Sequence, residues 1–138
     1  MFGSARKQNK MKTKIIQIGE AICDKEIYPR NLVDWMTTYR YAKAMQSKAK
    51  FPPITVASLN NKLLVVDGFH RLDAYKSNKE THIEVEILEG LDKHQIFIES
   101  VKRNIGHGRQ FNSQERTRII LTLEKWEISK EVISEIVR

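Results

Sequence analysis

A group of residues suited to binding an anion lies in the stretch VVDGFHRLDAY, between Asp67 and Arg71. A carboxylate, a glycine, an imidazole and a guanidinium follow β-branched apolar residues, and the pattern after them is helical. A helix start has unpaired backbone N–H groups and a partial positive charge, and both attract phosphate. We therefore expect a phosphate near Gly68, His70 and Arg71, since the glycine permits a close approach and the arginine supplies a fixed charge.

Asp67 fits this interpretation less directly, because a carboxylate repels a bare phosphate. It could cap the helix, orient Arg71 or bind a magnesium ion through its oxygens. A plainer alternative also stays open, in which Asp67 caps the helix, Gly68 forms a turn, and His70 and Arg71 are exposed to water. The residue types alone do not decide between an anion site and a polar turn.

A second cluster repeats this chemistry in NIGHGRQFNSQER, residues 104–116. Two glycines, a histidine and an arginine precede a predicted helix there. Two such loops in one small domain favour a shared anionic ligand, although the segment alone could be an ordinary connector between helices. The candidate residues in it are Asn104, His107, Gly108 and Arg109. In a third segment, KEIYPR, Pro29 restricts the loop and Arg30 could reach the same ligand.

The elements that would position these clusters are predicted from the spacing of apolar residues. Strands are predicted at 14–21, 54–59, 62–66 and 82–88. Helices are predicted at 32–47, 70–76, 93–103, 113–126 and 129–138. The residues expected to cap helices are Asn31, Ser113 and Ser129. Asn60-Asn61 predicts a hairpin turn, and the order βαββαβ followed by helices is typical of an α+β fold with a helical C-terminal annex.

The composition is that of a globular chain. With 138 residues, 41% of them hydrophobic and 30% charged, the chain can bury one core and is not of a disordered type. No apolar run approaches the roughly 18 residues of a membrane span, and the N-terminus lacks the apolar stretch of a secretory signal. Cys23 is the only cysteine, which excludes an internal disulfide and a cysteine zinc cluster. We expect a cytoplasmic protein that binds no membrane.

Most of the net charge of +7 lies in the first 14 residues. They hold five basic residues and no acid, and the remaining 19 basic and 17 acidic residues contribute only +2. Such a tail attracts nucleic acid in a salt-dependent way, although it could equally serve only to keep the chain in solution. The basic residues concerned are Arg6, Lys7, Lys10, Lys12 and Lys14.

Taken in order, these motifs resemble those of the ParB/sulfiredoxin superfamily. The segments that carry the resemblance are PPITV, VVDGFHRLDAY, EVEIL and NIGHGRQFNSQER. ParB-like domains of DNA-binding regulators often read D-G-x-H-R-x-x-A, then N-x-x-H-G and a helix with an arginine. The matching positions are Asp67, Gly68, His70, Arg71, Ala74, Asn104, His107, Gly108 and Arg116. The resemblance implies an α+β fold with a small mixed sheet, divided into a basic tail at 1–13, a nucleotide-binding domain at 14–112 and a helical annex at 113–138.

The residues around Gly68 discriminate among the activities of this superfamily. Sulfiredoxins require a cysteine directly after the glycine, and Phe69 stands there, so we do not expect a sulfiredoxin. Partition ParB proteins bind CTP through Gly-Glu-Arg-Arg, of which only Gly68 and Arg71 match. Free-serine kinases carry Asp-Gly-His-His-Arg and an upstream catalytic glutamate. Glu26 is the candidate for that base if the chain is a kinase.

The C-terminal segment SKEVISEIVR resembles the first helix of a helix-turn-helix. No recognition helix follows before Arg138. We therefore expect a piece of a longer DNA-binding protein, and the alternative is a domain that ends with this helix.

The resemblance implies a module that binds CTP, ATP or ADP in a DNA-binding partition or transcription-regulatory protein associated with the nucleoid or a plasmid. The residues assigned to the nucleotide are Gly68, Phe69, His70, Arg71, Asn104, His107, Gly108, Arg109 and Arg30, with Mg²⁺ at Asp67. DNA would be reached through a longer parent protein or the tail, and a homodimer stays open. NTPase activity, an ATP- or ADP-dependent small-molecule kinase, a ParB-like nuclease and a recruitment module with a vestigial pocket are the alternatives.

Overall fold

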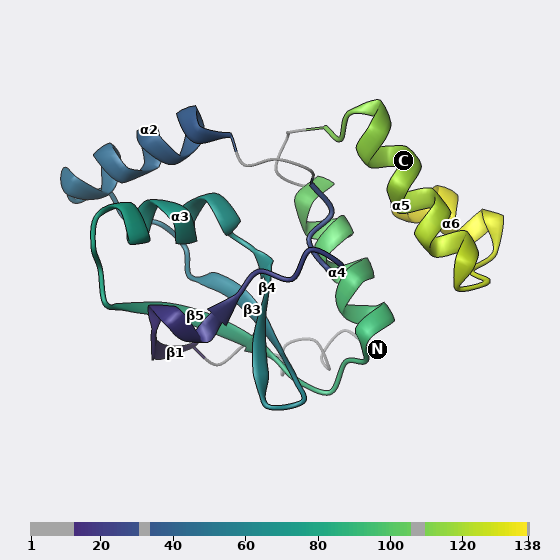
Figure 1. Cartoon of the computed structure of the whole chain (residues 1–138), viewed down its shortest axis with the longest axis horizontal. Helices are drawn as coiled ribbons and strands as arrows, with labels where there is room; N and C mark the ends of the chain where they lie inside the picture. Colours follow the sequence, from purple (N-terminus) through teal and green to yellow (C-terminus); the bar gives the residue numbers. More distant parts are fainter. Residues whose placement is uncertain (1–12, 31–33, 106–109, 138) are drawn as a thin grey trace, which may run out of the picture.

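A five-stranded mixed sheet is the centre of the fold in this computed structural model, which describes residues 13–30, 34–105 and 110–137 (Figure 1). The strands are β1 (Thr13–Gln17), β2 (Ala21–Ile22), β3 (Ile54–Leu59), β4 (Lys62–Asp67) and β5 (His82–Leu88). Their order across the sheet is β1-β5-β3-β4-β2. The pairs β1–β5 and β3–β4 are antiparallel, whereas β3–β5 and β2–β4 are parallel.

Helices lie on both sides of this sheet. The helical segments of the described residues are η1 (Ile18–Glu20, a 3-10 turn), α2 (Trp35–Gln46), α3 (Phe69–Ser77), α4 (Lys93–Ile105), α5 (Ser113–Lys125) and α6 (Lys130–Val137). The predicted α+β class and the helical C-terminal annex are therefore confirmed. Within the described residues, no helix has the length and apolar character needed to cross a membrane.

The alternation of β4 divides the core into two clusters. Leu64 and Val66 pack with α4, α5 and α6, whereas Val65, between them, packs with Leu72 of α3. The sheet is therefore a wall between α3 on one side and α4 on the other, as successive side chains of a strand require. Because Leu123 of α5 belongs to the first cluster, the helical annex shares a core with the sheet. A domain boundary at residue 112 stays a prediction.

The strand predicted at 14–21 is two strands, which is a correction. β1 ends at Gln17, whose backbone N–H donates to the Glu20 carboxylate over 3.0 Å, and a single 3-10 turn follows. β2 then pairs with β4 at the opposite end of the strand order from β1. Apolar residues lie on both sides of the turn, so their pattern alone does not reveal the break.

Two of the predicted helix caps also need correction. Asp34 caps α2 by accepting from the backbone N–H of Met36, and residues 31–33, with Asn31, lie outside the described residues. Asn112 rather than Ser113 caps α5, in a reciprocal capping box with Glu115. The predicted cap at Ser129 is confirmed, because its hydroxyl accepts from the N–H of Val132. The hairpin turn at Asn60-Asn61 is confirmed as well, with φ of 51° and 65°.

Candidate anion-binding site

A cavity of about 90 Å³ lies where β4 passes into α3. Residues from the loop after β2, from α2, from the β4–α3 turn and from the end of α4 line it. The lining residues are Tyr28, Arg30, Tyr41, Asp67, Gly68, Phe69, His70, Arg71 and Asn104. Pockets for whole small molecules usually measure roughly 300 to 1,000 Å³, so this cavity has room for a phosphate-sized group.

The structure brings predicted residues from three distant segments to this one cavity. Arg30, the turn from Asp67 to Arg71, and Asn104 all line it. Lys14, the last basic residue assigned to DNA, is exposed on β1. The other predicted residues lie outside the described residues: Arg6, Lys7, Lys10, Lys12, His107, Gly108 and Arg109.

Gly68 is the N-cap of α3, and its backbone requires a glycine. Its φ is 107°, in the region that side chains disfavour. A Cβ added there would lie 2.8 Å from Nη2 of Arg71. We expected the glycine to leave room for phosphate oxygens, but a guanidinium packs directly over it. The first intrahelical hydrogen bond runs from Leu72 N to Gly68 O over 2.8 Å, so the N–H groups of Phe69 and Arg71 precede the helical ladder.

Arg71 is buried, and the protein itself holds its guanidinium. Nη1 donates to the carbonyl oxygens of Pro52 and Pro53, over 2.8 and 3.0 Å. Nη2 lies 3.5 Å from the carboxylate of Asp67. Of the three roles considered for Asp67, orienting Arg71 is therefore the one that the geometry supports. Arg71 presents a fixed positive charge to the cavity rather than a flexible side chain that could reach out for a ligand.

His70 ties the start of α3 to the start of α2. Its Nε2 accepts the backbone N–H of Asp34 over 3.0 Å, which requires that nitrogen to carry no proton. The Asp34 carboxylate in turn accepts from the Met36 N–H and the Thr37 hydroxyl. Because His70 accepts here as a neutral imidazole, the expected role as a cationic phosphate ligand would require this bond to break.

Arg30 is the second buried arginine of the cavity, and it links parts far apart in the chain. Its guanidinium donates to the carbonyl oxygens of Gln110 and Asn104, each over 3.3 Å. It also lies 3.5 Å from the Glu115 carboxylate and 4.4 Å from the centre of the Phe111 ring. Arg30 therefore connects the loop after β2 to the end of α4 and the start of α5. Glu115 was not predicted, although the spacing Asn112-x-x-Glu115 is a recognisable capping box.

Aromatic rings form the apolar part of the cavity. Tyr28 and Phe69 pack with ring centres 4.8 Å apart, and Tyr41 packs on Phe51 at 5.1 Å. Tyr28 and Tyr41 line the cavity but were not predicted, because no motif marks them. Phe69 thus has a packing role in the turn at the start of α3.

Glu26 and Cys23, two side chains with reactive groups, are not among the described residues that line the cavity. Glu26 is exposed and forms an ion pair with Lys93 at the start of α4. The hydrogen bond from Lys93, and then its charge, hold the pKa of Glu26 below its ordinary value, which makes it a weaker base. Burial, and then the nearby Asp24, raise the pKa of the Cys23 thiol to about 11. Cys23 is therefore protonated near neutral pH and a poor nucleophile.

The cavity is suited to an anion more than to a metal held by protein alone. Among the described residues of its lining, two arginines against one aspartate give a formal charge of +1 with His70 neutral. The described residues contain no group of three or more His, Cys, Asp or Glu side chains that could hold a metal ion. Asp67 could contribute one oxygen to Mg²⁺, and the remaining ligands would have to be phosphate oxygens and water.

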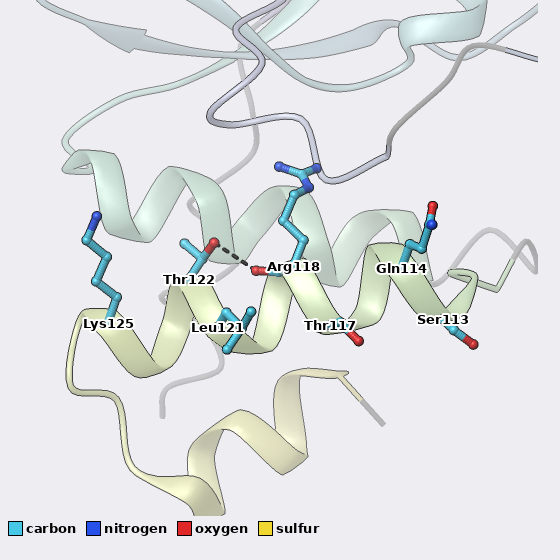
Figure 2. Close-up of a pocket in the computed structure, with 7 residues that line it drawn as sticks. All are labelled: Ser113, Gln114, Thr117, Arg118, Leu121, Thr122 and Lys125. Atoms are coloured by element: carbon cyan, nitrogen blue, oxygen red, sulfur yellow. Dashed lines mark hydrogen bonds between the residues drawn. The ribbon is translucent and has the colours of Figure 1, made fainter.

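A larger hollow, of about 520 Å³, lies along one face of α5 from Ser113 to Lys125 (Figure 2). Figure 2 shows the Arg118 side chain extending from this face toward the loop after β2, where its Nη2 donates to the Tyr28 carbonyl oxygen over 3.0 Å. None of the residues expected to bind a ligand lies among its described lining. Size alone therefore does not identify the site, and the convergence of charged groups favours the smaller cavity.

Comparisons with known proteins found one curated relative and several solved structures with a similar fold. No family model matches the chain. A possible regulatory protein of the streptomycin biosynthesis operon of Streptomyces griseus is 36% identical over 84 residues, which make up 58% of this chain and 23% of that protein. The chain thus spans about a quarter of the length of this relative.

Solved structures extend the similarity over most of the chain. C-terminally truncated ParB from Caulobacter crescentus, complexed to the centromeric parS site, has a TM-score of 0.64 at 15% identity and covers 90% of this chain and 64% of its own. The same protein complexed with CTP-γ-S has a TM-score of 0.62 at 16% identity, with coverage of 91% and 71%. Sulfiredoxin from Arabidopsis thaliana has a TM-score of 0.50 at 14% identity, with coverage of 57% and 86%. The chain therefore has the ParB/sulfiredoxin fold that its motifs predicted.

Proposed function

We propose that the chain is a module that binds a nucleoside phosphate, CTP or ATP, within a DNA-binding partition or regulatory protein. One observation carries the proposal. Two buried arginines from distant segments, Arg30 and Arg71, and the start of α3 converge on a cavity of phosphate size. Asp67 and Glu115 already offset the charge of these two guanidinium groups, but the described lining of the cavity holds two arginines and one aspartate and so still favours an anion such as phosphate.

In this proposal, each wall of the cavity would contact a part of the nucleotide. A phosphate at the start of α3 would accept from the N–H groups of Phe69 and Arg71 and gain from the helix dipole. Arg30 would meet it from the opposite wall, together with Asn104. The sugar and base would have to lie outside the cavity, because its volume is used by one phosphate. If Mg²⁺ accompanies the nucleotide, Asp67 is the residue that would contribute a ligand oxygen, and the ion would neutralise part of the phosphate charge.

The wider biological role rests on the named relatives. The truncated ParB structures contain CTP-γ-S in one case and the parS site in the other, and the curated relative is a possible regulatory protein. These names support a nucleotide-responsive part of a DNA-binding protein. DNA contact by the basic residues of the first 14 positions belongs to the same proposal, and it would be electrostatic and independent of sequence.

A small-molecule kinase is the second function that the sequence suggested, but the geometry does not support Glu26 as its general base. Glu26 pairs with Lys93 at the surface and is not among the described residues of the cavity lining. A general base must come within hydrogen-bond reach of the hydroxyl it activates. Nucleotide binding without phosphoryl transfer is therefore the function that we propose.

Isothermal titration calorimetry with CTP, ATP, ADP and GTP, with and without Mg²⁺, tests the proposal. At least one nucleotide should bind with one site per chain. Arg71→Ala should weaken this binding by about 10- to 100-fold, because a charged hydrogen-bond donor contributes roughly 1.5 to 3 kcal/mol. Thermal melts of each variant would show that it is folded at the temperature of the titration.

The matched control is Arg103→Ala. Arg103 is also a partly buried arginine, bonded to Glu99 and Thr55, but it does not line the cavity, so its loss should leave nucleotide affinity unchanged. The proposal fails if none of the four nucleotides binds, or if the two arginine variants bind equally. Duplex DNA binding that disappears when Lys7, Lys10 and Lys12 become alanine, but not in Arg71→Ala, would assign DNA contact to the tail.

A further inference from the structure

The outer face of α2 carries large exposed side chains that the cavity does not use. Trp35 is 70% exposed, Tyr39 52% and Met36 39%. Tyr39 is four residues after Trp35 and three after Met36, so it neighbours both on the helix surface and the three side chains form one stripe. Single exposed apolar residues are common on proteins, but a cluster that contains a tryptophan and a tyrosine marks an interaction surface.

The packing of α2 explains why this stripe faces solvent. Figure 1 shows α2 as the outermost layer, with α3 between it and the sheet. The opposite side of α2 is fixed to α3: Thr38 donates to the Asp73 carboxylate over 3.4 Å, and Asn78 donates to the Ala42 carbonyl oxygen over 3.1 Å. The helix cannot turn its aromatic stripe inward without losing these contacts.

The charged side chains that α2 itself contributes to this surface are all basic. Residues 35–50 include four basic residues and no acid. Arg40 and Lys43 are exposed on the same stripe as the rings, and Nζ of Lys43 lies 5.8 Å from the centre of the Tyr39 ring. The nearest acid in sequence, Asp34, is engaged as the N-cap of the helix. Aromatic faces therefore alternate with cations over about two turns.

We propose that this stripe of α2 binds single-stranded nucleic acid. Bases would stack on Trp35 and Tyr39 while Arg40 and Lys43 contact the backbone phosphates, which is the combination that non-specific single-strand binding needs. A duplex fits poorly, because its paired bases present edges rather than faces. This surface is separate from the phosphate cavity, so the proposal goes beyond the function proposed above.

Other occupants fit the same features less well. A helix that lies on a membrane segregates its cations from its apolar face, whereas here both kinds of side chain share one stripe. A second copy of the chain, docked face to face, would bring the cations of two stripes together, and like charges at an interface cost affinity. Nucleic acid satisfies both the rings and the charge.

Tryptophan fluorescence of the full chain with a 15-residue oligothymidine tests the proposal. The chain has two tryptophans, and the Trp126 ring stacks on the His94 ring with ring centres 3.8 Å apart. A Trp126→Phe background keeps an aromatic ring there and isolates the emission of Trp35. The oligonucleotide should quench this emission, and duplex DNA of the same length should quench it far less.

Anisotropy of the labelled oligonucleotide measures the affinity in parallel. Tyr39→Ala and Trp35→Ala should each weaken binding about tenfold, as loss of one stacked base does. Lys43→Ala should weaken it and lower the salt slope by about one. Leu121→Ala removes a side chain that is 59% exposed on α5 and should change nothing.

Three results would overturn the proposal. The first is binding that is unaffected by Trp35→Ala and Tyr39→Ala, which would assign the strand to the basic tail. The second is a shift of Trp35 emission with anionic vesicles but not with the oligonucleotide. The third is a concentration-dependent dimer in sedimentation that Tyr39→Ala dissociates while the oligonucleotide does not bind.

Discussion

The two arginines of the cavity are held in opposite ways. Arg71 makes short bonds, of 2.8 and 3.0 Å, to carbonyl oxygens of the segment before β3, and it pairs with Asp67 four residues away. The contacts of Arg30 with Gln110, Asn104 and Glu115 are longer, at 3.3 to 3.5 Å, and join residues more than 70 positions apart. Arg71 contacts residues near the β4–α3 turn, whereas Arg30 connects the loop after β2 to the end of α4 and the start of α5.

This difference indicates how the two sides of the cavity would respond to a ligand. Donor–acceptor distances near 2.9 Å are typical of strong hydrogen bonds, whereas 3.3 to 3.5 Å is at the weak end. The Arg71 side is therefore a rigid wall. The Arg30 side holds the loop after β2 to α4 and α5 with contacts that an anion could replace.

Gly68 gives the largest expected effect, because it lies beneath the rigid arginine. Gly68→Ala should lower the free energy of unfolding by about 3 kcal/mol, from left-handed backbone strain and from the contact with Arg71. Urea denaturation measures this change. Gly90→Ala, at φ 84° but with open space among the described residues, should cost about 1 kcal/mol and isolates the backbone contribution.

Gly19→Ala is the matched control for both variants. Among the described residues nothing lies within 4 Å of a Cβ added at Gly19, and its cost should stay within about 0.5 kcal/mol. Equal losses at Gly68 and Gly90 would contradict the tight packing of Arg71 on the turn, and the rigid side of the comparison would no longer hold.

The Arg30 side should show an intermediate effect. Glu115→Gln keeps an oxygen for the capping box but removes the charge, and Arg30→Met keeps most of the side-chain volume. A double-mutant cycle in urea should give a coupling of about 1 kcal/mol between the two residues. Zero coupling would mean that α5 is held by its apolar core alone. Bound nucleotide should reduce the coupling if the anion replaces Glu115 as the partner of Arg30.

The surface pair of Glu26 and Lys93 should show the smallest effect. The pKa of Glu26 is held below its ordinary value of 4.5, first by the hydrogen bond and then by the charge of Lys93. This contribution to stability is complete above that ordinary value and is lost as the pH falls through the lowered pKa. An NMR titration of the Glu26 carboxyl carbon should show the midpoint returning toward 4.5 in Lys93→Ala. An unchanged midpoint would refute the pairing, and high salt should also weaken the shift.

The central strands and their turn could be predicted because their signals are local. A short run of mostly apolar residues marks β3, alternating apolar residues mark β5, and Asn60-Asn61 tolerates the positive φ that a tight hairpin turn requires. The cluster of Gly68, His70 and Arg71 at one turn was equally visible. Its association with Asn104 followed from the resemblance and from the repeated chemistry, not from spacing.

The partners of the site residues could not be predicted in the same way. The carbonyl oxygens that hold Arg71 belong to Pro52 and Pro53, and every residue has such an oxygen, so no side chain marks them. The bond from Asp34 to His70 depends on how α2 packs on α3. Tyr41 reaches the cavity through that same packing. Tertiary contacts of this kind become visible only when the elements are placed in space.

The single 3-10 turn between β1 and β2 has a consequence for the whole sheet. Four residue steps from Gln17 to Ala21 span at most about 14 Å, whereas four strand spacings across a flat five-stranded sheet measure about 19 Å. The sheet must therefore curl until its two margins approach each other, with residues 13–22 fastened along both. Removal of this one segment would uncover backbone donors and acceptors on β4 and β5 together and offer two templates for intermolecular strand pairing.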